Sequence, residues 1–134
     1  MLDDNAMREL LTETKVIAVV GHSDKPHRTS YQIAQYLRNV GYTVYAVNPT
    51  VEEIDGERSY ASLADVPEPI DIVDVFRRSE HLQRVVDDAI AAGAKAIWTQ
   101  LGVSDADAAL TATAANVPIV MDRCIKVEHM RLVE

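Results

Sequence analysis

Residues 15–36 constrain the fold of this chain more than any other stretch. They begin with the apolar run 16–20, in which four of the five residues are β-branched. Such a run is typical of a strand that is buried on both faces of a parallel sheet. Gly21 permits a sharp turn of the backbone, and after the polar segment 22–29 we expect Ser30 to be the N-cap of a helix. Together these elements predict the first half of a nucleotide-binding βαβ unit.

The start of this predicted helix is suited to an anion, because its first backbone N–H groups have no partner within the helix. Lys25 and Arg28 add two positive charges in the preceding loop. Gly21 is the only glycine of that loop, so the dinucleotide fingerprint and the Walker loop are both absent. The second predicted strand ends in VNP at residues 47–49, without the acid that commonly holds a ribose. These features disfavour an ordinary NAD or ATP enzyme. They leave two alternatives, a pocket for another anionic ligand and an α/β unit that binds nothing here.

The composition indicates one globular domain. The chain has 134 residues, of which 48% are hydrophobic, and its apolar runs are too short to span a bilayer. A single cysteine, Cys124, excludes an internal disulfide and a cysteine-rich metal site. The formal net charge of -8 disfavours a nucleic-acid surface, which relies on clustered lysines and arginines. Since no signal peptide is recognisable in the first residues, we expect a cytoplasmic protein with neither a nucleic-acid nor a membrane partner.

The rest of the sequence alternates predicted strands with predicted helices. We expect a single domain over residues 1–134, with an N-terminal helix in 1–14, a core in 15–122 and a closing helix in 123–134. The further strands are expected at residues 43–47, 70–76, 94–99 and 117–121. Two further helices are expected to have Ser79 and Ser104 as N-caps. This order predicts an α/β fold with a three-layer, doubly wound parallel sheet of the Rossmann-like class, in which ligands bind at the carboxyl ends of the strands.

Several loops meet at the carboxyl ends of the predicted strands. Their candidate ligand-binding side chains are Lys25, Arg28, Thr29, Ser30, Phe76 and Arg77. Guanidinium groups suit phosphate oxygens, and the ring of Phe76 offers an apolar wall to a nucleobase. For Arg77 and Arg78 the alternative is an ordinary solvated surface, which suits Arg78 better because Arg77 lies nearer to the strand end.

No catalytic or metal-binding set stands out in the sequence. The four histidines are scattered, without the spacing of a zinc site. Ser23 lacks the flanking glycines of a nucleophile elbow, so a hydrolase is unsupported. Asp71 and Asp74 are three residues apart on one predicted strand and therefore point to opposite faces, unlike a working pair of carboxylates.

Five motifs in order resemble those of the small stand-alone CoA-binding proteins. They are VVGHSDKPHRTSY, AVNPT, DIVDVFRRSE, WTQLG and MDRCIKVEH. The similarity covers residues 15–129 and extends more distantly to the N-terminal CoA-binding domain of the succinyl-CoA synthetase α-subunit. The resemblance implies a Rossmann-like fold with coenzyme A bound across the strand ends. The sequence lacks the later synthetase domain with its phosphorylated histidine, so the resemblance does not extend to thioester ligation.

The resemblance also implies which residues contact the ligand. The phosphates would lie at Gly21, Ser23, Lys25, Arg28 and Ser30, with His22 and Thr29 in the same loop. The neighbouring wall would be formed by Asn48 and Pro49, and the adenosine side by Val75, Phe76 and Arg77. The pantetheine arm would lie nearer to Gln100 and Gly102.

The leading interpretation is a protein that binds coenzyme A or an acyl-CoA as a non-catalytic carrier, sensor or regulatory module. The alternatives are an enzyme acting on an acyl-CoA or a CoA disulfide, and another nucleotide-binding module. Cys124 opens the closing helix, where its thiol could form a mixed disulfide with that of the pantetheine arm; otherwise it is an inert buried cysteine. A homodimer or a protein partner is left open.

Overall fold

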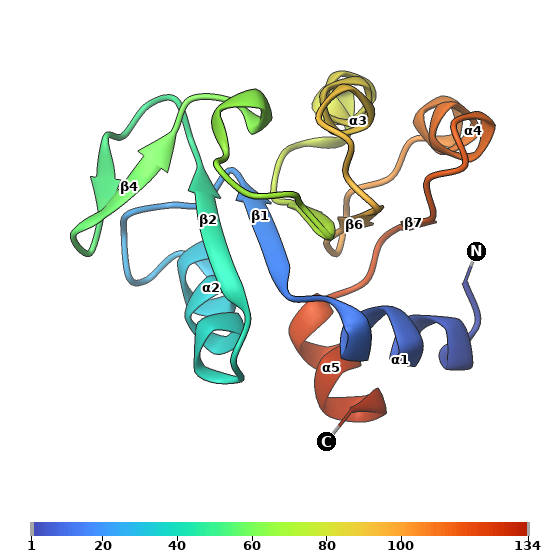
Figure 1. The fold of residues 1–134 in the computed structure, drawn as a ribbon, viewed down its shortest axis with the longest axis horizontal. Coiled ribbons are helices and arrows are strands. Elements are labelled where there is room, and N and C mark those ends of the chain that lie inside the picture. The colour runs from blue at the N-terminus through green and yellow to red at the C-terminus, as the bar shows by residue number, and fades with distance from the viewer. Residues whose placement is uncertain (1, 134) are drawn as a thin grey trace.

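A central β-sheet organises the fold (Figure 1). The structure is a computed structural model that describes residues 2–133, so Met1 and Glu134 of the expected domain lie outside the described residues. The strands of the described chain are β1 (Val16–Val20), β2 (Thr43–Val47), β3 (Glu53–Ile54), β4 (Glu57–Tyr60), β5 (Ile72–Val75), β6 (Ala96–Thr99) and β7 (Ile119–Val120). They are arranged in the order β3-β4-β2-β1-β5-β6-β7. Neighbours are parallel, except that β3 and β4 form an antiparallel hairpin at one edge.

Helices cover both faces of this sheet. They are α1 (Asp4–Glu13), α2 (Thr29–Asn39), α3 (Leu82–Ala91), α4 (Ala106–Ala114) and α5 (Ile125–Leu132), with the short 3-10 helices η1 (Leu63–Asp65) and η2 (Ser79–His81). Figure 1 shows α3 and α4 on one face and α1, α2 and α5 on the other. The predicted three-layer, doubly wound α/β fold is confirmed. None of the helices in the described part of the chain has the length and apolar character needed to cross a bilayer.

The apolar run at the start of the organising stretch forms the middle of the core. All five residues of β1 are buried, as the sequence predicts for a strand covered on both faces. Along β5, Val73 packs in the layer below α3 and α4, whereas Ile72 packs in the layer below α1, α2 and α5. Trp98 in β6 is fully buried in the second layer, and its indole N–H donates to the carbonyl oxygen of Arg123 at 2.9 Å. The two core layers therefore hold the carboxyl ends of the central strands in a fixed arrangement.

The predicted N-cap of the first core helix is wrong. Helix α2 begins at Thr29 with Arg28 in the N-cap position, so Ser30 lies inside the first turn. The hydroxyl oxygen of Ser30 accepts a hydrogen bond from the backbone N–H of Ser23 at 2.9 Å. Ser30 therefore folds the preceding loop back onto the helix instead of capping it.

Ser79 and Ser104 do not cap helices either. Ser79 begins η2, and its hydroxyl donates to the carbonyl oxygen of Gly102 at 3.2 Å and accepts from the N–H of Ser104 at 3.0 Å. The N-cap of α4 is Asp105, whose carboxylate accepts from two backbone N–H groups of the first turn. These serines serve to connect loops, a role that depends on tertiary contacts and leaves no local signal.

The predicted strands 70–76, 94–99 and 117–121 are longer than the observed ones, and Asp71 lies just before β5. One carboxylate oxygen of Asp71 accepts from the backbone N–H groups of Lys15 and Val16, each at 2.9 Å. The other is 3.3 Å from the ammonium nitrogen of Lys95. Asp71 therefore joins the starts of β1, β5 and β6, while Asp74 alone of the two lies in the strand.

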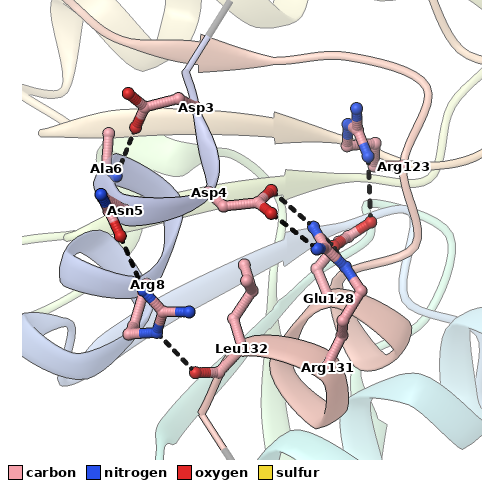
Figure 2. A network of polar contacts seen from close by, with 9 residues as sticks. All are labelled: Asp3, Asp4, Asn5, Ala6, Arg8, Arg123, Glu128, Arg131 and Leu132. Carbon is pink, nitrogen blue, oxygen red and sulfur yellow. Dashed lines mark hydrogen bonds and ion pairs between the residues drawn. The ribbon is translucent and has the colours of Figure 1, made fainter.

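The N-terminal and closing helices are joined by a polar network (Figure 2). Arg131 donates to both carboxylate oxygens of Asp4 at 2.8 Å and to the Glu128 carboxylate, also at 2.8 Å. The hydrogen bond from Arg131 lowers the pKa of the Asp4 carboxyl. Arg123 donates to the other oxygen of Glu128 at 3.1 Å, and only 8% of the Glu128 side chain is exposed. These bonds dock α1 against α5 and fix the segment that follows β7.

Candidate functional site

Gly21 brings the end of β1 unusually close to the chain that follows β5. Its φ is +88°, and a Cβ at this position would lie 2.6 Å from the carbonyl oxygen of Phe76. The backbone N–H of Gly21 donates to the carbonyl oxygen of Val47 at 2.9 Å. A glycine is therefore required where the ends of β1, β2 and β5 meet, which is the sharp turn that the sequence predicts.

His22 holds the following loop to α2. Its Nδ1 lies 2.8 Å from the carbonyl oxygen of Ser23, and its Nε2 lies 3.0 Å from a guanidinium nitrogen of Arg38. Because a guanidinium group can only donate, Nε2 accepts and the proton resides on Nδ1. Burial lowers the pKa of His22, in agreement with a neutral ring. The ring has no exposed surface, so His22 positions the loop rather than presenting a side chain to a ligand.

Asn48 connects the loops that follow β1 and β2. Its amide nitrogen donates to the carbonyl oxygen of His22 at 2.9 Å, and its Oδ1 accepts from the N–H and the hydroxyl of Thr50 at 3.0 and 2.7 Å. A carboxylate at this position could not donate to His22. The local geometry therefore explains why an amide stands where a dinucleotide enzyme has an acid.

A cleft of about 660 Å³ lies beside these loops, between η1 and α3. Its lining is partly apolar, with Val20, Val47, Leu63, Phe76 and Val85. Its charged and titratable side chains are Arg77, His81, Arg84 and Asp88. An apolar lining with a few charged groups suits a ligand that carries both a flat ring system and negative charge.

The cleft contains five of the residues that the sequence predicts to contact a ligand. They are Gly21, Asn48, Pro49, Phe76 and Arg77. The predicted loop residues Ser23, Lys25, Arg28, Thr29 and Ser30 lie outside its lining, in the loop after β1 and the first turn of α2. Val75 is fully buried and does not line the cleft. The structure therefore divides the predicted site between a cleft and a neighbouring basic loop.

A third group of predicted residues lies at the ends of β6 and β7. The side-chain oxygen of Gln100 accepts from the backbone N–H of Ile125 at 3.2 Å, at the start of α5. Gly102 donates its N–H to the carboxylate of Asp122 at 2.6 Å. Cys124 is the N-cap residue of α5 and is half-buried. These residues do not line the cleft; they join the two loops beside it.

Sequence reasoning missed the contribution of α3 to the cleft. His81, Arg84 and Asp88 flank the inward-facing Val85 at helical spacing, so they share one side of the helix. That spacing is a signal in the sequence, but an ordinary solvated helix has the same pattern.

Most of the positive charges without partners lie at this end of the molecule. In the part of the chain that the structure describes, the side chains of Lys15, Lys25, Arg28, Arg77 and Arg84 make no hydrogen bond or ion pair. All except Lys15 follow the carboxyl end of β1 or β5. In a protein with a net charge of -8, unpaired cations at one edge of the sheet indicate an anionic ligand.

Asp74 is a titratable group that the cleft does not include. Its carboxyl is fully buried in β5 beside Val19 and Trp98, and neither oxygen has a hydrogen-bond partner within residues 2–133. Burial raises the pKa of this carboxyl well above its usual value. The same residues contain no cluster of three or more histidine, cysteine or acidic side chains arranged for a metal ion.

Known proteins resemble this chain over most of its length. A family model described as a CoA binding domain matches residues 15–130. Uncharacterized protein YneT of Bacillus subtilis is 40% identical over 123 residues, which are 92% of this chain and 91% of that protein. The solved structure of a hypothetical protein from Pyrococcus horikoshii OT3 has 41% identity and a TM-score of 0.96, covering 99% of this chain and 94% of that one.

A larger enzyme contains a similar segment. Acetate–CoA ligase (ADP-forming) I of Archaeoglobus fulgidus is 35% identical over 80 residues. Those residues are 60% of this chain but only 12% of the ligase. The similarity therefore concerns a small part of that enzyme.

Proposed function

Because the chain belongs to the CoA-binding domain family, as its five motifs predict, we propose that it binds coenzyme A or an acyl-CoA at the carboxyl ends of β1, β2 and β5. The observation that carries this proposal is the group of unpaired cations beside a partly apolar cleft at the point where Gly21 turns the chain. Coenzyme A has a nucleobase, a pyrophosphate and a ribose phosphate at one end. Such a ligand matches both the apolar lining and the separated positive charges.

The pyrophosphate is assigned to the loop after β1 and the start of α2. Arg28 occupies the N-cap position without a side-chain hydrogen bond to the helix, so the first N–H groups of α2, those of Thr29 and Ser30 included, remain available to an anion. Lys25 and Arg28 are exposed in this loop, and Ser23 is held against the helix by Ser30. These features together form an anion site of backbone N–H groups and two cations.

The adenosine is assigned to the cleft, beside Pro49 and Phe76, and the pantetheine arm to the loops with Gln100 and Gly102. Those loops follow β6, the neighbour of β5 in the sheet, so an extended arm can pass along the strand ends. In this arrangement the thiol end of the ligand is directed toward Cys124. The order of the strands supports this path.

We favour a carrier, sensor or regulatory module over an enzyme. His22 and Asp74, whose pKa values burial shifts, lie outside the lining of the cleft, whereas groups tuned for acid–base chemistry normally face the substrate. The second candidate is an enzyme acting on a CoA disulfide. It is favoured by the position of Cys124 at the start of α5, where its thiolate could attack the disulfide, form a mixed disulfide and release one CoA thiolate.

Isothermal titration calorimetry with coenzyme A, ADP and NAD tests the proposal. We expect coenzyme A to bind, ADP to bind more weakly and NAD to bind poorly. Arg28→Ala should weaken coenzyme A binding by about 1.5–3 kcal/mol, the range of a charge-assisted hydrogen bond, and leave the fold intact. Absence of heat with coenzyme A would refute the proposed function.

Intact-mass spectrometry after incubation with CoA disulfide tests whether Cys124 reacts with the ligand. An adduct of one CoA that dithiothreitol removes, and that Cys124→Ser abolishes, would support a store or sensor of oxidised CoA or the second candidate. An unmodified wild-type protein that still binds coenzyme A supports the module without chemistry of its own.

A further inference from the structure

Two of the unpaired guanidinium groups line the cleft from separate elements. Arg77 follows β5, and its Cδ lies near Gly21, 3.3 Å from the position that a Cβ on this glycine would take. Arg84 lies on α3, on the side of the helix that faces η1. The two residues therefore bring positive charge to one cleft from the end of a strand and from a helix.

Within residues 2–133, neither of these two arginines forms an ion pair, in contrast to Arg78. Arg78, the next residue along the chain, is exposed over 86% of its side chain and lies 3.7 Å from the carboxylate of Glu80. Arg84 and Asp88 are four residues apart on α3 and line the same cleft, yet they form no ion pair within the described chain. The guanidinium group of Arg84 is thus left available to a ligand in the cleft.

We infer that Arg84 binds, together with Arg77, the phosphate on the ribose of the ligand, and that it sets a preference for coenzyme A over dephospho-CoA. This inference rests on the proposed function. Lys25 and Arg28 lie in another loop, where the backbone N–H groups of α2 suit the pyrophosphate. The ribose phosphate belongs to the adenosine end of the ligand, and two planar guanidinium forks from different elements can hold a tetrahedral dianion from two sides.

Asp88 opposes the phosphate in this arrangement. Its carboxylate lines the cleft one helical turn beyond Arg84, and like charges in one cleft repel. Removal of this negative charge should therefore strengthen the binding of the phosphate. Substitution of Arg84 and substitution of Asp88 should therefore change the affinity for coenzyme A in opposite directions.

Calorimetry with coenzyme A and dephospho-CoA tests the inference on four proteins, the wild type and the variants Arg84→Ala, Asp88→Asn and Arg78→Ala. We expect Arg84→Ala to weaken coenzyme A by about tenfold or more and to leave dephospho-CoA within about twofold. Asp88→Asn should increase the preference for coenzyme A severalfold. Arg78→Ala, the matched surface control, should change neither affinity. Because Arg84 is exposed, Arg84→Ala should lose affinity for coenzyme A without a change in its melting temperature.

The possible failures are distinguishable. If the wild type binds coenzyme A but Arg84→Ala weakens both ligands equally or neither of them, the role of Arg84 is refuted and the proposed function stands. If Asp88→Asn lowers the preference for coenzyme A, the phosphate does not lie beside α3. If the wild type binds neither ligand, the proposed function itself fails.

Discussion

The carboxyl of Asp74 should make the stability of this protein fall as the pH rises. The side chain is 0% exposed, between Val19 and Trp98 on the neighbouring strands, and its two oxygens have no hydrogen-bond partner within residues 2–133. Ionisation would leave an unpaired charge in an apolar layer, which is strongly unfavourable. Burial therefore holds the pKa of Asp74 well above 3.8, and the folded protein retains this proton where the unfolded chain has lost it.

The sign and the size of the effect follow from proton linkage. Above about pH 4 the unfolded chain releases the proton of Asp74, whereas the folded chain keeps it until the pH reaches the raised pKa. In this window the free energy of unfolding decreases by about 1.4 kcal/mol for each pH unit. The decrease ends once the folded protein also ionises. Asp74→Asn keeps the shape of the side chain and cannot ionise, so the variant should lack this component.

Urea denaturation of the wild type and Asp74→Asn between pH 4.5 and 7.5 measures the effect. In the difference in free energy of unfolding between the two proteins, the contributions of the other titrating groups cancel. We expect the free energy of unfolding of the variant, relative to that of the wild type, to rise by about 1.4 kcal/mol per pH unit at the acidic end. The rise should stop at the pKa of Asp74 in the folded protein. A constant difference between Asp74→Asn and the wild type would refute the reasoning.

Two further substitutions test the backbone of the site and its support. Gly21→Ala places a Cβ 2.6 Å from the Phe76 carbonyl oxygen, whereas Gly41→Ala has a similar positive φ with nothing within 4 Å. Denaturation should show that Gly41→Ala lowers the free energy of unfolding by about 1 kcal/mol and that Gly21→Ala lowers it clearly more. Gly21→Ala should also weaken the binding of coenzyme A. Equal losses of stability in the two variants would contradict the close approach at Gly21. Partial burial raises the pKa of Asp71, but the N–H groups of Val16 and Lys15 and the Lys95 ammonium lower it by more, so the pKa is lowered overall. Asp71→Asn should therefore destabilise the protein by about 1 kcal/mol at neutral pH, and this difference should vanish as the pH falls through the folded pKa; a loss that persists at low pH would show that the charge of Asp71 is not involved.

The framework of the site could be predicted because its signals are local. The β-branched run and Gly21 define a strand and a turn within six residues, and the parallel order of strands then places Asn48, Phe76 and Arg77 at the same edge. Ser30 is harder to interpret from the sequence, because a serine hydroxyl at this position can either cap the local helix or bond across the loop. The structure shows the second, and only the folded loop decides between them.

The cleft itself follows from a short connection between β4 and β5. A crossover between parallel strands usually contains an α-helix, whereas the described residues 61–71 contain only η1. Within the described residues, α3 therefore has the short helix η1 beside it on this side instead of another α-helix, and Val85 and Arg84 line a cleft. The prolines of this connection predict a loop, but they do not tell which helix the loop leaves uncovered. Helical periodicity identifies the side of α3 that faces the sheet, and the side that faces the cleft depends on an element elsewhere in the chain.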